Sequence, residues 1–455
     1  MNTGIVRQSP AQTDTTFASG PAEVDNAGQA PPAAEPIATS ALPAIEAPRG
    51  GGALRGTDER TDVSRATGAA SVTVPIPVPA GRAAIDPSPT LTYSSSNDAG
   101  PFGLGWSLTA SSIRRRTDTG VPRYIDGLDD RSADSDVFVL DGEDLVPVVD
   151  GGVPRRVDRV VGGIDYRIAT YQLRTEGDFV RAERWTDLAA DRSHWRTISA
   201  DNVATLYGID DSSRISNPEA PERIAEWRIA RRFDPRGNIT HYEWAAEDGR
   251  GVDLGRAHEA RRRQSDRAVQ RYLKRIQWAN RVPWLPERAA AHRAPLPEFR
   301  FSLTIDYGDH GGGPPGSQPD RPWAVRSDPF SSRRYGFEVR TYRRARRLLI
   351  HHHFPERPKI GPDLLTHSVQ LDYQEASARP GGSAYSLLRS IQSTGHGLAE
   401  AGHPVTTSLP PLEFEYTIAT IGARVTPVAD SDLGGLQGGL GVNASLRRIC
   451  SYQKR

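Results

Sequence analysis

Cysteine and long apolar runs are almost absent from the 455-residue chain. One thiol, Cys450, cannot form an internal disulfide or build a zinc site alone, so we expect a fold that does not depend on oxidation. No window approaches the roughly 18 apolar residues of a membrane-spanning helix. The opening, MNTGIVRQSPAQTDTTF, lacks the apolar stretch of about 7–15 residues found in a secretory signal peptide. We therefore expect a soluble protein that is made in the cytoplasm.

An excess of one charge sign is also missing. Lys and Arg total 57 and Asp and Glu total 56, which gives a formal net charge of +1. A strongly basic chain would favour nucleic acid or anionic membranes as partners, and this balance predicts neither. The catalytic patterns G-x-S-x-G and H-E-x-x-H and the Walker loop are absent as well. No recognised motif therefore predicts a catalytic residue, a metal or a cofactor.

Aromatic residues are nearly missing from residues 1–70, where Phe17 is the only one. This stretch is rich in Ala, Pro, Gly, Ser and Thr, as in GPAEVDNAGQAPPAAEPIATSALPAIEAPRGGGALRG. Such a composition buries too little apolar surface to offset its conformational entropy. We predict a disordered leader over 1–70 and a β-rich domain over 71–425.

The first strand pattern begins at Ser71. In SVTVPIPVPAGR, apolar side chains occupy every second position, which is typical of a strand with one apolar face. Pro75 and Pro77 remove backbone donors, so we expect this strand at an edge or at the start of a sheet. Gly81 then supplies a turn, and a second strand is expected around 91–93.

Three later stretches repeat this alternation. The clearest is 298–307, and shorter examples are 369–373 and 412–416. Loops such as DHGGGPPGSQPD (309–320) separate them. Short alternating strands with such loops indicate antiparallel β structure, with one face packed and one solvated. We predict a mainly β fold built on a large antiparallel sheet with one or few helices.

One segment breaks the β pattern. Residues 256–276, RAHEARRRQSDRAVQRYLKRI, contain no Gly or Pro, and Val269, Tyr272, Leu273 and Ile276 fall at helical spacing. We predict one helix packed on the sheets. Its other positions are strongly basic, which is typical of a solvated helix face; the alternative is a surface for an anionic partner.

Three adjacent imidazoles, His351, His352 and His353, are a candidate metal site. In a strand, successive side chains point to opposite faces, so only the first and third share a face. Glu356 lies beyond Pro355, and no further ligand is placed nearby in sequence. We favour an ordinary strand without a metal ion.

The pair Glu413 and Glu415 resembles the Glu-x-Glu signature of arginine-specific ADP-ribosyltransferases. Upstream, Arg389 and the pair Ser393 and Thr394 mimic the other two elements of that signature. Those enzymes place tens of residues between the Ser-Thr element and the glutamates, whereas here all of them lie in one short stretch. The alternation around the glutamates also makes them solvent-facing positions of a strand. We interpret the match as chance.

Six scattered tryptophans raise the alternative of a carbohydrate-binding module. Indole rings stack on sugars, but tryptophans in a β protein more often pack in the core or on a sheet surface. We favour packing, and keep sugar binding as the alternative, for Trp185, Trp195, Trp227, Trp244, Trp278 and Trp284.

The sequence Asp-Pro-Arg-Gly-Asn from Asp234 predicts a tight turn between two strands. Its proline fixes φ, while Gly237 and Asn238 tolerate positive φ. The next strand opens with Tyr242 on it. The turn resembles one unit of the YD/RHS repeats, whose strands wind into hollow β shells, but no regular spacing makes the chain a repeat array.

Several stretches together resemble the SpvB family, whose members include the B subunits of insecticidal Tc toxin complexes. Residues 71–147 have the family's order of a Pro-rich opening strand, a GPFGLGW turn, an Ile-x-Arg segment and an Asp-Val-Phe strand. FDPRGNITHYEWAAED, QRYLKRIQWANR and PPLEFEY extend the match over 71–418. The structural signature residues are Pro75, Pro77, Gly81, Pro101, Phe102, Gly103, Leu104, Gly105, Trp106, Asp234, Gly237, Asn238 and Tyr242.

This resemblance implies a structural part of a toxin and not an enzyme. Tc B subunits join a C-type RHS subunit in a hollow β-sheet cocoon that encloses a toxic fragment, and a β-propeller docks the cocoon onto a pore-forming A-type subunit. The same partners, and release from the cell, are implied here. In SpvB itself a similar region precedes an actin-modifying ADP-ribosyltransferase. The alternatives are therefore the N-terminal part of such a toxin, or a surface module.

The family pattern ends near residue 425. A B subunit continues there into a β-propeller, whereas VADSDLGGLQGGLG here leads into VNASLRRICSYQKR without strand alternation. We predict that 426–455 is an atypical tail that arises from truncation or a frameshift. The leading hypothesis is a structural and packaging component of a Tc/SpvB-type toxin.

Overall fold

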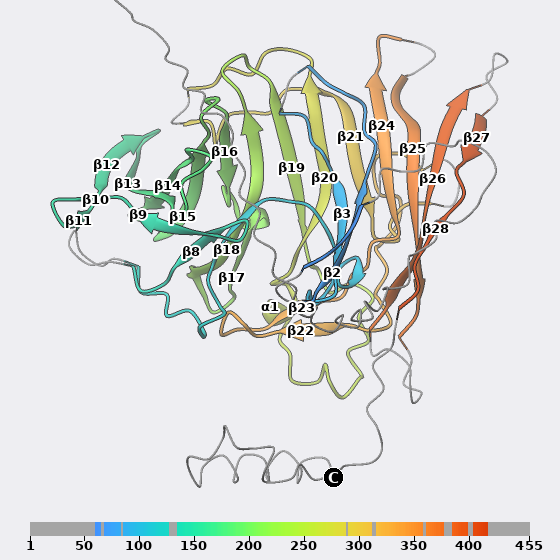
Figure 1. Ribbon diagram of the computed structural model, residues 1–455, viewed down its shortest axis with the longest axis horizontal. Coiled ribbons are helices and arrows are strands. Elements are labelled where there is room, and N and C mark those ends of the chain that lie inside the picture. Colours follow the sequence, from blue (N-terminus) through green and yellow to red (C-terminus); the bar gives the residue numbers. More distant parts are fainter. Residues whose placement is uncertain are drawn as a thin grey trace, which may run out of the picture. The chain divides into compact units, whose positions relative to one another are not determined.

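Strands make up nearly all the regular structure of the chain (Figure 1). The computed structural model describes residues 60–64, 68–82, 85–126, 134–287, 290–311, 315–357, 361–376, 385–398 and 404–416. Most of the predicted leader and the whole predicted tail lie outside these ranges. Within them, no helix is long and apolar enough to cross a membrane. The predicted mainly β fold class is confirmed.

Eight antiparallel strands close into a ring. Each pairs with the next, and the last returns to the first, in the order β13, β14, β15, β16, β18, β7, β8, β9. Side chains from all eight strands fill the interior, including Phe138, Trp195 and Trp227. The strands are β7 (Ser112–Arg115), β8 (Phe138–Leu140), β9 (Glu143–Pro147), β13 (Ile164–Leu173), β14 (Arg181–Asp187), β15 (Arg192–Ile198), β16 (Ala204–Tyr207) and β18 (Ala220–Phe233).

Beyond β18 the sheet continues as an open sheet, from the green strands through yellow to red in Figure 1. Each strand pairs with the next up to β26, and β27 and β28 both pair with β26. The strands predicted at 298–307, 369–373 and 412–416 are confirmed as β21, β25 and β28. The open sheet comprises β19 (Ile239–Ala246), β20 (Arg271–Asn280), β21 (Phe299–Asp306), β24 (Arg347–Phe354), β25 (Gly361–Gln374), β26 (Leu387–Leu398), β27 (Pro404–Ser408) and β28 (Leu412–Glu413).

A four-stranded sheet packs on one face of the open sheet. Its order is β1–β2–β3–β6. Val74, Leu91 and Trp106 share one hydrophobic core with Ile276 and Leu303 of the large sheet, and Figure 1 shows β2 and β3 in blue over the yellow strands. The strands are β1 (Arg60–Val63), β2 (Ala70–Pro75), β3 (Thr90–Ser94) and β6 (Trp106–Leu108).

Eight short strands complete the described sheets, and one 3₁₀ turn, η1 (Asp211–Ser213), and one short helix, α1 (Gln264–Arg267), lie between strands. Two of the short strands, β12 and β17, extend the large sheet by pairing with β13 and β18. The other six form three two-stranded ribbons. The short strands are β12 (Arg156–Val161), β17 (Arg214–Asn217), β4 (Ala99–Gly100), β5 (Gly103–Leu104), β10 (Val149–Asp150), β11 (Val153–Pro154), β22 (Phe330–Ser332) and β23 (Val339–Thr341).

The strand predicted from Ser71 is β2, and its prolines lie at its end. β1 pairs with β2 only as far as Thr73, while β3 pairs with it as far as Pro75. Residues 70–73 of β2 lie between two neighbouring strands, so the expectation of an edge strand is wrong for these residues. The missing donor of Pro75 falls beyond the last pair with β1, where it breaks no hydrogen bond of that ladder. Strand β1 itself lies within the segment that we assign to the leader.

The polar face of β21 is buried, whereas the sequence predicts a solvated face. Ser302 and Thr304 are both 0% exposed. The loop that follows β21 covers this face, and Lys274 Nζ holds it by donating to Asp309 Oδ2 at 2.8 Å. The expectation of one solvated face is therefore wrong here. The sequence does not show that the loop covers the sheet, because a Gly/Pro-rich loop has no periodic pattern that indicates where it packs.

The helix predicted over 256–276 is wrong. The chain forms one helical turn, α1 (Gln264–Arg267), and then enters β20. The pairing of β19 with β20 shifts register once and leaves Lys274 as the extra residue of a β-bulge. Because the bulge interrupts strict alternation, Leu273 and Ile276 both reach the core three positions apart, as they would in a helix.

Two basic residues of this segment, Arg262 and Arg267, are paired inside the protein, whereas Arg256, Arg261 and Arg263 are exposed. Glu259, 1% exposed, lies within 3.4 Å of Arg262, 3.3 Å of Arg267 and 3.0 Å of Arg340, and Tyr342 Oη donates to it at 2.7 Å. The expectation of a solvated basic helix face is therefore wrong for Arg262 and Arg267, because these two charges neutralise a buried carboxylate. Their pairing gives no argument for an anionic partner.

Glu338 belongs to the same cluster, since Arg262 Nε and Nη2 donate to its two carboxylate oxygens at 2.8 Å. Burial raises the pKa of Glu338, but hydrogen bonds from Arg262 and Ser331 outweigh burial and lower the pKa from 4.5 to about 2. A carboxyl whose pKa is lowered in the folded state stabilises the protein above its unfolded pKa. This contribution is lost as the pH falls toward 2.

We expect Glu338→Gln to flatten the fall in Tm between about pH 5 and pH 3. The variant has no carboxyl to protonate, so this part of the acid sensitivity disappears. Glu298→Gln, at a side chain that is 81% exposed, should keep the wild-type dependence. Thermal unfolding followed by circular dichroism across this pH range measures the slopes, and parallel slopes for wild type and Glu338→Gln would contradict the assignment.

Arg343 and Glu247 form an ion pair in which both side chains are 0% exposed. Arg343 Nε donates to the two oxygens of Glu247 at 2.9 and 3.1 Å. The ring of Trp323 lies against the guanidinium, with 4.6 Å between Arg343 Cζ and the ring centroid. Two buried charges are tolerated here because each neutralises the other.

Glu247→Gln should leave Arg343 as an uncompensated buried charge. Removing one partner of a buried pair costs about 3–5 kcal/mol, so we expect a loss of that size in the free energy of unfolding in urea. Asp248→Asn is the matched control, because its side chain is 41% exposed and a pair of that kind is worth less than about 1 kcal/mol. If the free energy of unfolding falls equally in the two variants, the stability of the fold does not depend on the pair of Arg343 and Glu247.

Candidate functional site

The GPFGLGW segment fastens the small sheet to the large one. Pro101 O accepts from Ala345 N at 2.9 Å, and Leu104 N donates to Ser386 O at 3.0 Å. Both partners belong to segments far along the chain, on either side of β24 and β25. The segment therefore connects the start of the described chain to its end through backbone hydrogen bonds.

Two glycines of this segment have backbone conformations that other residues rarely adopt. Gly103 has φ of +95° and Gly105 has φ of +79°. A Cβ on Gly105 would lie 2.5 Å from the ring of Tyr93 and 2.8 Å from Ser94 O, and one on Gly103 would lie 3.0 Å from Ser386 O. Glycine satisfies both the conformation and the close approach.

Trp106 is the apolar anchor of the segment and is 2% exposed. Its Nε1 donates to Tyr416 Oη at 2.7 Å, and Tyr416 Oη donates to Leu388 O at 2.7 Å. The ring of Phe414 lies 4.8 Å from the ring of Trp106, centroid to centroid. Phe102, 5% exposed, packs in the same core. Buried aromatic surface therefore reinforces the backbone contacts of the junction.

The signature residues of the opening strand lie at its exit. Pro75 and Pro77 are exposed on either side of buried Ile76. Gly81 N donates to Asp86 Oδ2 at 2.5 Å, and a Cβ on Gly81 would lie 2.3 Å from that carboxylate. These residues direct the chain from β2 toward β3.

The turn predicted from Asp234 joins β18 to β19. Asp234 Oδ1 accepts from the N–H groups of two following residues, one of them Asn238, at 2.9 Å. Gly237 has φ of +84°, and its carbonyl accepts from Trp284 N at 2.8 Å. Tyr242 lies further along β19 and packs against both large cores. The turn thus has a structural role and lies outside the cavity described next.

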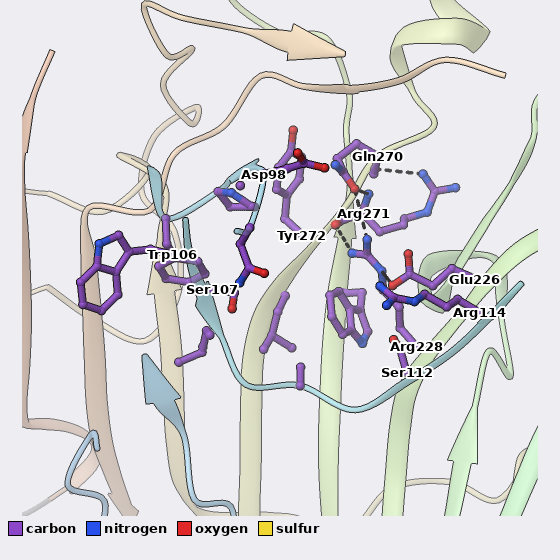
Figure 2. A pocket seen from close by; sticks show the side chains of 18 of the residues that line it. Asp98, Trp106, Ser107, Ser112, Arg114, Glu226, Arg228, Gln270, Arg271 and Tyr272 are labelled. Atoms are coloured by element: carbon purple, nitrogen blue, oxygen red, sulfur yellow. Dashed lines mark hydrogen bonds and ion pairs between the residues drawn. The ribbon is translucent and has the colours of Figure 1, made fainter. Parts of the chain in front are cut away.

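A cavity of about 530 Å³ lies beside the GPFGLGW junction (Figure 2). In this view Trp106 and Ser107 lie at one side and Arg114, Arg228 and Glu226 at the other. The junction supplies one wall, and β18 and β20 supply the opposite one. The charged and amide side chains that line it are Asn97, Asp98, Arg114, Glu226, Arg228, Gln270, Arg271 and Arg334.

Both carboxylates of this cavity are paired with arginines. Arg228 Nε donates to Glu226 Oε1 at 3.2 Å, and Arg228 Nη2 donates to Gln270 Oε1 at 3.3 Å. Arg334 forms an ion pair with Asp98. Each carboxylate of the cavity is thus held in place by an arginine.

The phenols that face the cavity are held in their neutral form. Burial raises the pKa of Tyr272 and of Tyr307. Tyr272 Oη accepts from Tyr342 N at 2.9 Å, which fixes its position. The described residues that line the cavity include no histidine and no cysteine. The lining of the cavity is therefore mainly polar and positively charged.

The three histidines lie in β24 as the sequence predicts. His351 and His353 share one face with their rings 6.4 Å apart. His351 Nε2 donates to Pro315 O at 2.9 Å, and His353 Nδ1 donates to Pro362 O at 2.8 Å. Within the described ranges, no group of three or more His, Cys, Asp or Glu side chains is placed to hold a metal ion.

The alternation predicted around the Glu-x-Glu pair is confirmed. Glu413 and Glu415 are exposed, while the apolar residues between and beside them are half-buried. Arg389 is also exposed, and Thr394 Oγ1 shares a hydrogen bond with Ser408 Oγ at 2.8 Å. These residues lie on the surface of β26 and its neighbours as ordinary strand positions.

The packing interpretation of the tryptophans is confirmed. Five of the six are at most 7% exposed, and the sixth is half-buried with its Nε1 donating to Ile229 O at 2.7 Å. Buried indoles cannot stack on a sugar. The five buried residues are Trp185, Trp195, Trp227, Trp278 and Trp284, and the half-buried one is Trp244.

Sequence reasoning found the junction but missed the cavity beside it. The turn residues form one contiguous motif, whereas Arg114, Glu226, Arg228 and Gln270 come from three separate regions of the chain. No spacing rule joins such positions. The only local signal is that the GPFGLGW turn supplies one wall.

The fold defines a class of mainly β protein in which large antiparallel sheets pack together, with a polar cavity beside their junction. The model of the SpvB family, described as Salmonella virulence plasmid 65kDa B protein, matches residues 64–354. The chain therefore belongs to the SpvB family. The mono(ADP-ribosyl)transferases SpvB of Salmonella typhimurium (strain 14028s / SGSC 2262) and Salmonella dublin are 35% identical over 339 residues. The match covers 72% of this chain and 54% of each relative, so the chain spans about half their length.

Solved structures give the same relationship. The N-terminal domain of effector protein SpvB from Salmonella typhimurium strain LT2 has a TM-score of 0.63 at 32% identity, covering 71% of this chain and 99% of that one. TcdB2-TccC3 has a TM-score of 0.68 at 30% identity, over 83% of this chain and 17% of that one. The Photorhabdus luminescens Tc holotoxin pore reaches 0.67 at 30% identity, with the same coverage. The predicted resemblance is confirmed, and the chain is a toxin-related domain.

Gly105→Ala should destabilise the junction more than Gly142→Ala. Both positions have positive φ, at +79° and +107°, and a non-glycine residue in such a conformation costs about 1–3 kcal/mol. A Cβ on Gly105 also meets Tyr93, whereas one on Gly142 meets nothing within 4 Å. We expect an extra loss of about 1–3 kcal/mol from overpacking, measured by urea unfolding. Equal losses would show that the close approach at Gly105 is unimportant.

Proposed function

We propose that this chain is a non-catalytic structural and packaging component of a Tc/SpvB-type toxin. It contributes to a β-sheet shell that encloses or presents a toxic fragment. The observation that carries the proposal is the likeness of 83% of the chain to TcdB2-TccC3 at a TM-score of 0.68. The cavity beside GPFGLGW supports it, because its carboxylates are paired with arginines.

The mechanism of such a component is physical. A filled ring and a sheet packed on both faces form a stiff wall, which confines a cargo by excluded volume. Among the described strands, β12 pairs only with β13, and β27 pairs only with β26. These outer strands present backbone groups to which further strands of a shell can add. The partners that fit this role are a C-type RHS subunit and an A-type pore subunit.

A second candidate is the N-terminal part of an actin ADP-ribosyltransferase toxin. The observation that favours it is the match to 99% of the N-terminal domain of effector protein SpvB. In this candidate the chain again supplies a non-catalytic domain, beside a transferase domain. The net charge of +1 favours protein partners over nucleic acid in both cases, and both imply synthesis in the cytoplasm followed by release from the cell.

The packaging role predicts a stable complex with a C-type subunit. When the full chain is co-expressed with a Tc C-type RHS subunit, we expect the two to elute together in size-exclusion chromatography at their summed mass. An unrelated β-sheet protein of similar mass serves as the control and should elute separately. Separate elution of this chain from the C-type subunit at micromolar concentrations would contradict the packaging role.

A further inference from the structure

Two further cavities lie on the face of the open sheet opposite the small sheet. Their volumes are about 420 and 350 Å³, and they adjoin at Arg275 and Gln318, which belong to the walls of both; we call the two together the groove. Arg275 projects from β20 on the face opposite that of Ile276, which packs in the core beneath the small sheet. The groove is therefore separate from the cavity in Figure 2.

Arg275 is the central charged group of this groove and is 9% exposed. Its Nη2 donates to Ser317 O at 2.8 Å. Its Nε is buried and has no hydrogen-bond partner, and Glu243 Oε2 lies 3.8 Å from Nη1, beyond hydrogen-bonding distance. A buried N–H group without an acceptor is unfavourable. A carboxylate is the acceptor whose two oxygens match the planar guanidinium.

The other cations of the groove already have close carboxylate partners. Lys274 pairs with Asp309 at 2.8 Å, and Arg281 pairs with Glu356 at 2.9 Å. Further along the walls the pairs are Arg250 with Asp248 at 3.5 Å and Arg321 with Asp320 at 3.1 Å. Of the two buried cations among the described groove residues, Lys274 and Arg275, Arg275 is the one whose carboxylate neighbour lies beyond hydrogen-bonding distance.

The walls of the groove suit an extended chain. Five prolines line it, and a proline offers an apolar ring and a carbonyl acceptor but no N–H donor. The carbonyl groups of these prolines can accept hydrogen bonds from the backbone N–H groups of a bound peptide. Trp323 lines one of the two cavities and Phe299 the other. The prolines are Pro297, Pro319, Pro322, Pro355 and Pro362.

We propose that this groove binds an extended peptide segment whose Asp or Glu carboxylate pairs with Arg275. A nucleic acid fits less well, because Glu243, Asp248 and Glu298 also line the groove and repel a continuous polyanion. One carboxylate among otherwise uncharged residues matches one incompletely bonded guanidinium. The site lies apart from the GPFGLGW junction, and its peptide-binding role goes beyond the proposed packaging function.

The test is a titration of the full chain with a fluorescein-labelled nonapeptide of alanine and proline that has one central glutamate. The same peptide with a central glutamine is the matched control ligand. Fluorescence anisotropy at low ionic strength should show binding of the glutamate peptide at least about tenfold tighter than the glutamine peptide, because one charged hydrogen-bonded pair is worth about 1.5–3 kcal/mol. Equal affinities, or no binding of either peptide, would overturn the proposal.

Three variants assign the effect to the groove. Arg275→Gln should abolish the preference for glutamate, and Glu243→Gln should tighten binding about threefold, because it removes a competing carboxylate near Nη1. Arg159→Gln, at an exposed arginine on β12, should leave the affinity unchanged. If Arg275→Gln does not fold, the test rests on Glu243→Gln. An affinity of Glu243→Gln for the glutamate peptide equal to that of the wild type would then refute the site. Association with a C-type subunit is measured separately, so a failure of this proposal is distinguishable from a failure of packaging.

Discussion

Strand β18 holds the two halves of the large sheet together. It is 14 residues long and pairs with β16 and β17 along one edge and with β7 and β19 along the other. Its Trp227 lies in the core of the closed ring, while its Phe233 packs with Ile239 and Trp284 in a separate cluster. Because one strand belongs to both parts, the ring cannot move against the open sheet without breaking backbone hydrogen bonds.

A sheet that is packed on both faces must bury polar groups, and this chain does so with ion pairs. Arg115, 1% exposed in its side chain, lies 2.6 Å from Asp126 and 2.8 Å from Asp136. Arg184 pairs with Asp134 at 2.9 Å. The nearly equal numbers of basic and acidic residues therefore reflect pairing within the protein. Composition alone could not show this, since it does not distinguish paired charges from solvated ones.

The sequence predicted the elements that follow from local patterns. β2, β21 and β25 show in their alternation, and the GPFGLGW junction and the turn at Asp234 show in their glycines. The bulge at Lys274 could not be predicted, because it depends on register with β19 and makes a strand imitate a helix. The covering of β21 by the following loop, the closure of the ring and the cavity beside Trp106 depend on contacts between distant segments, which no local period encodes.

In the function that we propose, the sheets confine a partner and do not react with it. Wall stiffness comes from the shared strand, the filled ring and the buried ion pairs, and the cavity carboxylates are committed to arginines. The most direct measurement is transfer of radiolabelled ADP-ribose from NAD to actin by the purified full chain. The account predicts no label on actin above a reaction without the chain, and label that increases with the amount of chain would contradict it.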